Sequence, residues 1–209
     1  LANSMSVALE NARLFDETQR LLKETEQRNA ELAIINSVQE ALAAELNIQG
    51  IYDAVGDKIR EIFHRADIGI RVYDRDAGLI HFPYFFKDGH RLNVPSEPLG
   101  DTGISAHVLR TRETLVINED MPGAIAKYGS RILGPALEKS SVFVPLIVGD
   151  RARGLLNLLD MHREHAFSDS DVRLLQTLAN SMSVALENAR LFDETQRLLK
   201  ETEQRAAEL

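Results

Sequence analysis

Apolar residues recur at three- and four-residue steps through the first 46 residues of the chain, and no Gly or Pro interrupts them before Gly50. This spacing places the apolar side chains along one side of an α-helix. A continuous helix over residues 1–47 would be about 70 Å long at the rise of an α-helix. Since one small domain covers less than this length, the pattern predicts a helix that pairs with another chain. The alternative is an amphipathic helix that folds back on its own domain.

From residue 50 to residue 167 the apolar pattern shortens to alternation and to short runs between turns. Strands are expected at 68–73, 79–86, 114–118, 141–148 and 153–159, a short helix at 102–110, and an irregular stretch with one helix at 122–138. Gly149-Asp150-Arg151 reads as the turn of a hairpin. The sum is an α+β domain: an antiparallel sheet of about six strands, flanked by long N- and C-terminal helices that form a dimeric helical bundle or coiled coil.

Residues 1–32 and 178–209 have the same sequence except at one position, Asn29 against Ala206. Residue n of the first copy therefore corresponds to residue n + 177 of the second. The economical explanation is a tandem array, in which residues 1–32 end one unit and residues 178–209 lead into the next. A duplicated spacer on a single domain is the alternative. Ser168 and Asp171 form a capping box that predicts the start of the second long helix.

The repeat divides the chain into three parts. Residues 1–47 are the end of the preceding repeat, a linker and the first helix, residues 48–167 hold the sheet and the pocket region, and residues 168–209 are the C-terminal helix and signalling linker. Polar residues at Gln19 and Gln196 interrupt the apolar stripe, which is typical of a coiled coil of modest stability. The expected dimer seam consists of Leu1, Met5, Ala8, Phe15, Leu22, Leu178, Met182, Ala185, Ala189, Phe192 and Leu199.

Composition excludes several classes of protein. The chain has no cysteine, which removes disulfides, zinc ribbons, cysteine nucleophiles and thioether-linked chromophores. Its 32 acidic and 24 basic residues give a formal net charge of −8, which argues against a nucleic-acid-binding surface. No apolar run is long enough to span a bilayer and no signal peptide opens the sequence. We therefore expect a cytoplasmic module with neither a nucleic acid nor, in this segment, a membrane as partner.

Catalytic and metal-binding patterns are not recognisable. There is no Ser/His/Asp arrangement, no phosphate-cradling glycine loop and no paired-carboxylate site, so no enzyme activity and no catalytic residue are expected. His162 and His165 lie in a loop without further ligands, so no metal site is expected. His107 could line a pocket or bind haem axially, although a lone histidine on a short helix is more often an ordinary half-buried side chain.

Dispersed motifs resemble those of the GAF domain, the small-molecule-sensing module of bacterial signalling proteins and phosphodiesterases. In chain order they are LGDTGIS at 99–105, VLRTRE at 108–113, LVIN at 115–118, SSVFVPL at 140–146, RGLLNL at 153–158, FSDSDVRLL at 167–175 and ALENARL at 185–191. The resemblance covers residues 33–192. Repeats that end in LFDETQRLLKETEQR resemble the multi-GAF sensory regions that precede adenylate/guanylate cyclase or histidine kinase output domains.

This resemblance implies a regulatory module of a tandem signalling array that binds an unidentified small molecule and relays a conformational signal through its helices. Its partners would be a second copy in a homodimer, neighbouring GAF repeats and an output domain of the same chain. The alternative is a ligand-free dimerisation spacer that sets register between domains. Family members that attach a bilin or reduce methionine sulfoxide use cysteines, which are absent here. Of the Asn-Lys, Phe, Asp-Glu signature of cyclic-nucleotide binding, only Phe167 and Asp171 match, so the cofactor stays unidentified.

In the GAF fold one sheet face meets the terminal helices and the other floors the ligand pocket. Arg71 and Tyr73 alternate with Ile70 and Val72 along one strand, so the apolar pair should take the helices and Arg71 the pocket. A guanidinium there could hold a small anionic ligand through a carboxylate or phosphate, whereas the alternative is an ion pair at the sheet margin. The candidate ligand-binding residues are Arg71, Tyr73, Tyr84, Thr102, Gly103, His107 and Asn157.

Overall fold

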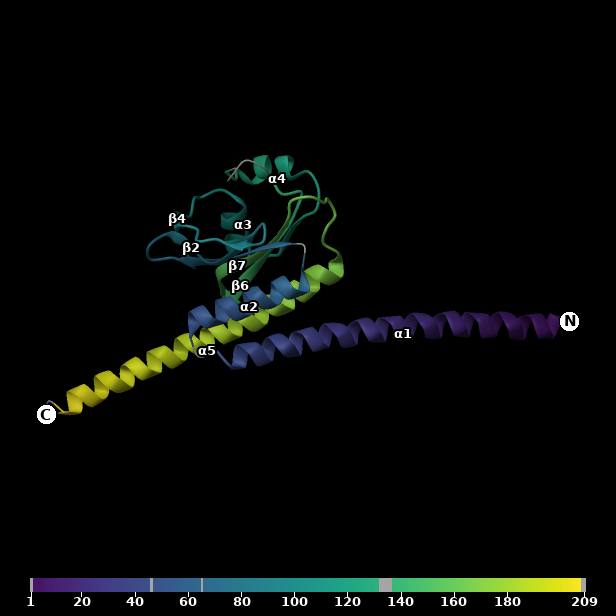
Figure 1. The fold of residues 1–209 in the computed structure, drawn as a ribbon, viewed down its shortest axis with the longest axis horizontal. Helices are drawn as coiled ribbons and strands as arrows, with labels where there is room; N and C mark the ends of the chain where they lie inside the picture. Colours follow the sequence, from purple (N-terminus) through teal and green to yellow (C-terminus); the bar gives the residue numbers. More distant parts are fainter. Residues whose placement is uncertain (1, 46, 65, 132–136, 208–209) are drawn as a thin grey trace. The chain divides into compact units, whose positions relative to one another are not determined.

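The computed structural model describes residues 2–45, 47–64, 66–131 and 137–207, and the chain divides into two units, Leu1–Ser37 and Val38–Leu209. Helix α1 (Ala2–Ala43) makes up the described part of the first unit and continues into the second (Figure 1). Leu1, which was assigned to the dimer seam, lies outside the described residues. Among the described residues, no helix is long and apolar enough to cross a membrane.

The second unit is the α+β domain that the sequence predicts (Figure 1). After α1 its elements are α2 (Ile48–Ile62), β1 (Asp67–Asp74), β2 (Leu79–Lys87), β3 (His90–Arg91), β4 (Glu97–Pro98), α3 (Ile104–Thr111), β5 (Leu115–Ile117), α4 (Met121–Tyr128), β6 (Ser140–Val148), β7 (Arg151–Asp160) and α5 (Asp169–Ala207). The five strands expected from alternation are all present, within two residues at each end.

The strands form one antiparallel sheet in the order β3-β2-β1-β7-β6-β5, and β4 pairs with the other part of β2. A two-residue turn joins β6 to β7, and Gly149 there has a φ of 64°, a conformation that glycine adopts without steric cost. The predicted fold class, an antiparallel sheet flanked by long helices, is confirmed.

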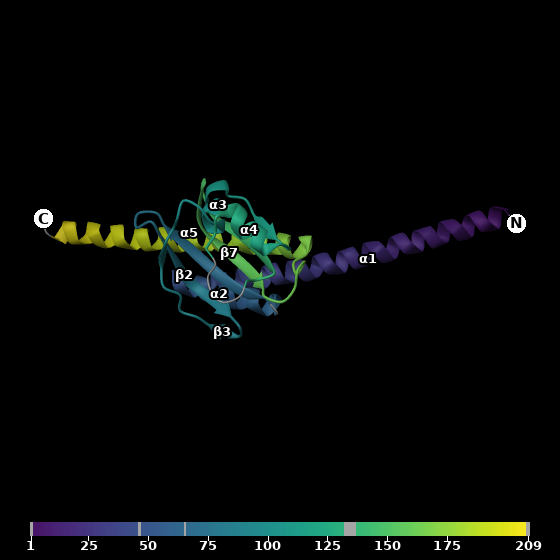
Figure 2. The ribbon, with the colours of Figure 1, turned by 90° about the horizontal axis from the view of Figure 1, so that it is seen from above.

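Two helical layers cover the sheet. Helices α2 and α5 lie on one face, and α3 and α4 lie on the other (Figures 1 and 2). We call these the α5 face and the α3 face. Cross-strand rows on the α5 face are Ile68–Leu158–Val142 and Ile70–Leu156–Val144, and rows on the α3 face are Gly69–Asn157–Phe143 and Arg71–Leu155–Pro145. The alternation of apolar and polar residues along β1 thus divides them between the faces as predicted.

Helix α2 is missing from the sequence-based expectations, which end the first helix near residue 47 and place the sheet region directly after it. The structure ends α1 at Ala43 and starts a new helix at Ile48, with the Asn47 side chain accepting a hydrogen bond from the Gly50 amide at 2.7 Å. Ile51, Val55 and Ile59 are spaced three to four residues apart and are fully buried. This periodicity was available in the sequence and indicates a helix that packs on the sheet.

Helix α5 begins as predicted. The Ser168 amide and hydroxyl both donate to the Asp171 carboxylate, at 2.8 and 2.7 Å, and the Asp171 amide donates to the Ser168 hydroxyl at 3.2 Å. Leu178 and Met182 are fully buried within this chain, against its own sheet layer. This corrects their assignment to a seam between chains, because a side chain already in the core is not accessible to a partner helix.

Candidate functional site

Arg71 is a half-buried cation on the α3 face, and its Nε is fully buried. Its Nη1 donates a hydrogen bond to the Ser105 hydroxyl of α3 at 2.6 Å, and its Cζ lies 5.7 Å from the ring centroid of Phe82 and 5.8 Å from that of Phe143. Burial lowers the pKa of the guanidinium, and the carboxylates of Glu97 and Glu138 offset this only in part. The group therefore carries its positive charge in a poorly solvated position.

This cation is incompletely satisfied. The Arg71 Nε is buried and has no hydrogen-bond partner among the described residues. None of the ion pairs within that part of the chain involves Arg71. The alternative prediction, an arginine paired with a carboxylate at the sheet margin, thus finds no support in the described contacts. A buried donor without a partner costs about 1–3 kcal/mol.

Asn157 lies on the same face, one strand away. It pairs with Gly69 on β1, while Arg71 pairs with Leu155, so the two polar side chains are diagonal neighbours on adjacent strands. Asn157 is fully buried, and neither its amide oxygen nor its amide nitrogen has a partner among the described groups. A Cβ at Gly69 would collide with the Asn157 oxygen and stand 3.0 Å from the Phe85 ring, so glycine is required for this close approach.

Tyr84 lies on the other side of the sheet, which corrects its place in the predicted ligand set. A register shift gives β2 one more residue than β1 between the pairs Ile70–Tyr84 and Val72–His81, and Pro83 falls within this bulge. The extra residue turns Tyr84 to the α5 face, where its hydroxyl donates to Asp57 of α2 at 2.7 Å. Tyr84 is therefore part of the packing between the sheet and α2.

Thr102 and Gly103 join α3 to the end of α4. The Gly103 amide donates to the Tyr128 carbonyl at 2.7 Å, and the Ile104 amide donates to the Ser130 hydroxyl at 2.8 Å. Thr102 is exposed, and its hydroxyl donates to the Gly129 carbonyl at 3.4 Å. The amides of Gly103 and Ile104 at the start of α3 are thus already engaged within the domain.

Two further candidate residues, Tyr73 and His107, make no contact with Arg71 or Asn157 among the described interactions. Tyr73 follows Arg71 on β1 and is half-buried. The His107 ring packs on the Tyr128 ring, with centroids 4.6 Å apart and the planes tilted by 49°. Within the described ranges, no three His, Asp or Glu side chains gather in a way that could hold a metal ion.

Sequence reasoning missed the groups that surround Arg71. Ser105, Phe82 and Phe143 all contact the guanidinium, yet they lie on three different elements. The available signal for Ser105 was its position in the first turn of a short helix beside the buried Ile104. The two phenylalanines read as ordinary strand residues, and only their register against β1 and β7 places them next to Arg71.

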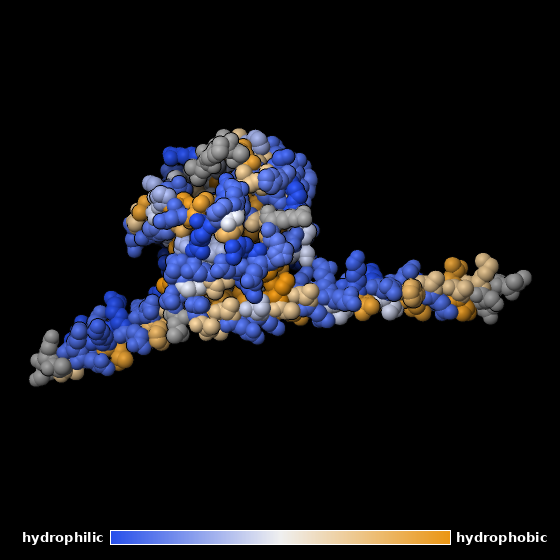
Figure 3. Space-filling view, in the orientation of Figure 1, coloured by the Kyte–Doolittle hydropathy of each residue, from blue (hydrophilic) through white to orange (hydrophobic). Residues whose placement is uncertain are grey.

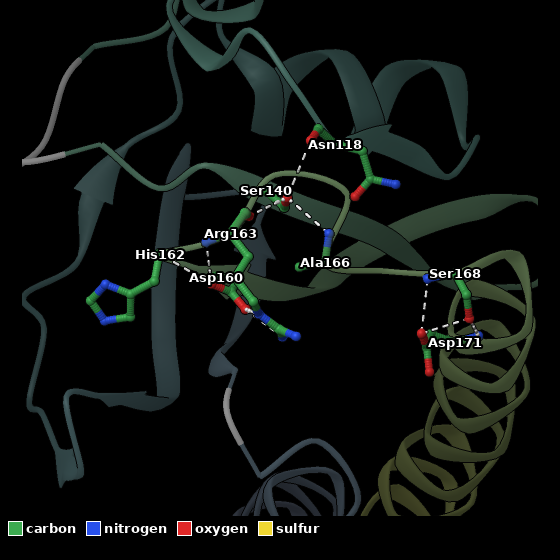
Figure 4. A network of polar contacts seen from close by, with 8 residues as sticks. All are labelled: Asn118, Ser140, Asp160, His162, Arg163, Ala166, Ser168 and Asp171. Carbon is green, nitrogen blue, oxygen red and sulfur yellow. Dashed lines mark hydrogen bonds and ion pairs between the residues drawn. The ribbon is translucent and has the colours of Figure 1, made fainter.

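A network of hydrogen bonds, which we call the clasp, fastens the loop between β7 and α5 to the ends of β5 and β6 (Figure 4). The Ser140 hydroxyl lies 2.7 Å from the Arg163 carbonyl and 3.3 Å from the Asn118 carbonyl, and it accepts a hydrogen bond from the Ala166 amide. The Asn118 amide nitrogen donates to the Phe167 carbonyl at 2.9 Å. The clasp thereby fixes the residues from which α5 begins.

Asp160 is the buried acid of the clasp. Its carboxylate accepts hydrogen bonds from the amides of His162 and Arg163 and from two guanidinium nitrogens of Arg163, at distances of 2.7–2.9 Å. Burial alone would raise the pKa of this carboxyl, but the amides and the guanidinium outweigh it and hold the pKa below its usual value. Asp160 is therefore a structural anion with every contact supplied from within the loop.

Helix α5 also presents apolar side chains to solvent. Val184, Leu191, Phe192, Leu198 and Leu199 are each about half exposed or more, and Figure 3 shows apolar residues on the surface of the long helices. A groove of about 610 Å³ lies between the last residues of α1 and this part of α5, lined by Leu42, Val184, Ala185, Ala189 and Phe192 among others.

Comparison with models of protein families identifies the family of the α+β domain. The GAF domain family model matches residues 45–187, which is more than half of the chain, and the chain belongs to this family. GAF domains are in general sensory or regulatory ligand-binding modules, not catalysts.

The relatives found by sequence comparison are several times longer than this chain, and one of them is a transcriptional activator. The formate hydrogenlyase transcriptional activator FhlA of Escherichia coli K12 is 24% identical over 170 residues, which are 79% of this chain and 24% of FhlA. The protein YtrP of Bacillus subtilis 168 is 25% identical over 203 residues, which are 96% of this chain and 31% of YtrP. The chain thus spans only about a quarter to a third of these relatives.

Solved structures share the fold at low sequence identity. The GAF domain of an Acinetobacter phosphoenolpyruvate-protein phosphotransferase superposes with a TM-score of 0.66 at 14% identity, covering 78% of this chain and 96% of that one. The free methionine-R-sulfoxide reductase of Neisseria meningitidis, solved with its substrate, gives a TM-score of 0.63 at 18% identity, covering 77% and 90%. The fold therefore occurs in the GAF domain of a phosphotransferase and in a reductase, and identity this low shows the fold alone.

Proposed function

We propose that this GAF domain senses a small anionic molecule, which binds on the α3 face through Arg71 and Asn157. The observation that carries the proposal is three buried polar atoms that have no partner among the described residues, Arg71 Nε and both amide atoms of Asn157, on adjacent strands beneath α3. A carboxylate or phosphate oxygen would accept from Arg71, and a second polar group of the ligand would pair with the Asn157 amide.

The energetics favour a ligand over a purely structural role. A core that only had to be stable would replace Arg71 and Asn157 by apolar residues, because unpartnered polar groups in the interior destabilise the fold. Their retention beside Phe82, Phe143 and Leu155 is a local conflict of the kind expected at functional sites. Binding would offset the desolvation cost by supplying the missing hydrogen bonds.

The clasp offers a path from this site to α5. Helix α4, which is joined to α3 through the Gly103–Tyr128 hydrogen bond, begins at Met121, three residues after Asn118. Asn118 in turn holds Phe167 and His165, just before α5. A ligand that favours one position of α3 and α4 would bias the start of α5, and through α5 an output domain joined to it.

Dimerisation through the long helices completes this mechanism. The exposed apolar residues of α5 continue from the groove that Leu42 and Phe192 line, so a helix of a second copy could cover both. Burial of this stripe would stabilise a homodimer, and Gln196 within it would favour register over strength. A ligand-free spacer would use the same surface and leave Arg71 unused.

Native mass spectrometry of gently purified protein tests the ligand. We expect a dimer with a reproducible extra mass, and the loss of that mass in Arg71→Leu. The matched control is Arg91→Leu, which also removes an arginine from an aromatic ring, since Arg91 lies 3.7 Å from the Tyr84 ring centroid, but does so away from the α3 face. An extra mass that survives Arg71→Leu would overturn the assignment of the site, and a bare dimer would favour the spacer.

A further inference from the structure

The two copies of the repeated helix have the same sequence but a different environment. Met182 of the second copy is fully buried, whereas the corresponding Met5 of the first copy is 67% exposed. Every described side chain from residue 5 to residue 30 is exposed, although the corresponding Ser183 and Ala189 of the second copy are buried. Identical sequences thus form a core in one unit and a bare helix in the other.

The difference in side-chain exposure between the two copies ends at about residue 12 of the first copy. Leu14 and Leu191 are both 47% exposed, and Leu22 and Leu199 are 54% and 53% exposed. Val7 and Val184 are also exposed in both copies, at 56% and 62%. The copies therefore differ on one helical face up to about residue 12, the part whose counterpart packs on β6 and α2, and are equivalent beyond it.

We propose that residues 5–12 are a docking face for a second sheet domain of the same kind as residues 38–177, joined to this helix on its N-terminal side in the same polypeptide. The face carries the side chains that complete the core in the second copy, in the same order and spacing. A partner that fits it must present an apolar sheet face and a helix like β6 and α2. This inference concerns α1 and does not depend on the proposed ligand.

An upstream domain in the same polypeptide fits this face better than a second copy of the chain. In every 209-residue chain the sheet is already covered by the α5 of that chain, whose Leu175, Leu178 and Met182 are fully buried. A free copy therefore has no vacant α5 face to offer. In the second copy the helix also follows directly from the strand β7 of the sheet that it covers, and the same connection for the first copy places the sheet upstream.

The test is a two-unit chain in which a second copy of residues 33–177 is fused before Leu1. Met182→Leu is introduced so that the two otherwise identical peptides can be distinguished. We expect peroxide to oxidise Met5 at least about tenfold more slowly in the two-unit chain than in the 209-residue chain, because oxidation follows exposure. An unchanged rate of Met5 oxidation would overturn the proposal.

Paired substitutions separate docking from a general effect on the helix. In the two-unit chain, Met5→Lys should abolish the unfolding transition of the upstream unit, while Val7→Lys, at a position exposed in both copies, should leave it in place. In the 209-residue chain neither substitution should change the melting temperature. Equal effects of the two substitutions in the two-unit chain, or an upstream unit that does not fold at all, would contradict the proposal.

Discussion

The α5 face and the α3 face of the sheet are built from alternate residues of the same strands, but they meet different requirements. On the α5 face, the two rows that cross β1, β7 and β6 contain only aliphatic side chains, and each is at most 3% exposed. On the α3 face, the corresponding rows contain Arg71 and Asn157 among Phe143 and Leu155. The aliphatic rows are satisfied by packing, and the other face retains buried polar atoms that have no partner among the described residues.

Stability and the proposed ligand binding are thereby assigned to opposite faces of one sheet. The aliphatic rows bury apolar surface at a gain of about 25 cal/mol per Å², and they hold the helices that extend from the domain. The polar pair reduces stability, and its hydrogen-bonding atoms that no described residue satisfies are the ones that the proposed ligand would use. Because successive residues of a strand point to opposite faces, both functions fit into one strand such as β7 without interference.

The largest expected effect is on the α5 face. Leu158→Ala should lower the free energy of unfolding by about 3 kcal/mol, because a fully buried leucine that packs beside Ile68 and Val142 leaves a cavity. This corresponds to a fall of about 10 °C in the melting temperature of a domain of this size, measured by calorimetry. Leu92→Ala, at an exposed position outside the long helices, is the control and should change stability by less than about 0.5 kcal/mol. Equal losses at both positions would mean that packing on the α5 face is not what stabilises the domain.

The next effect concerns the clasp, which ties the end of β7 to α5. Asp160→Asn should lower stability by about 2 kcal/mol at pH 7, since hydrogen bonds from Arg163 to the charged carboxylate are lost. Folding lowers the pKa of Asp160, so the wild-type advantage is fully present above about pH 4, the unfolded value, and disappears as the pH falls below it. Denaturant melts of both proteins from pH 7 to pH 3 measure this, and a constant difference across the range would contradict the role of the charge.

The fold was largely predictable from the sequence because its signals are local. Alternation in β1 separates Ile70 from Arg71, and the capping box of Ser168 and Asp171 marks the start of α5. Helix α2 was not predicted, although the three- to four-residue spacing of Ile51, Val55 and Ile59 indicates a helix. The sequence-based prediction ended the long first helix at residue 47 and placed the sheet region directly after it. The error therefore lies in the interpretation and not in a missing signal.

The site was less predictable because it depends on register between strands. A one-residue bulge near Pro83 moves Tyr84 to the α5 face, and periodicity alone gives no sign of it. Arg71 was placed correctly by alternation, but its contact with Ser105 joins residues 34 positions apart and arises only when α3 packs on the sheet. The lack of partners for Asn157 is likewise a property of the packed structure.

The smallest expected effect has the opposite sign and separates the two faces most directly. Asn157→Val should raise the free energy of unfolding by about 1 kcal/mol, because it removes a buried amide that no described group satisfies. Leu156→Val, its neighbour on β7 but on the α5 face, should lower the same quantity by about 1 kcal/mol through lost packing. Urea unfolding of the two variants measures both signs. Destabilisation by Asn157→Val would mean that the amide is satisfied in solution, and the α3 face would then be a structural core like the α5 face.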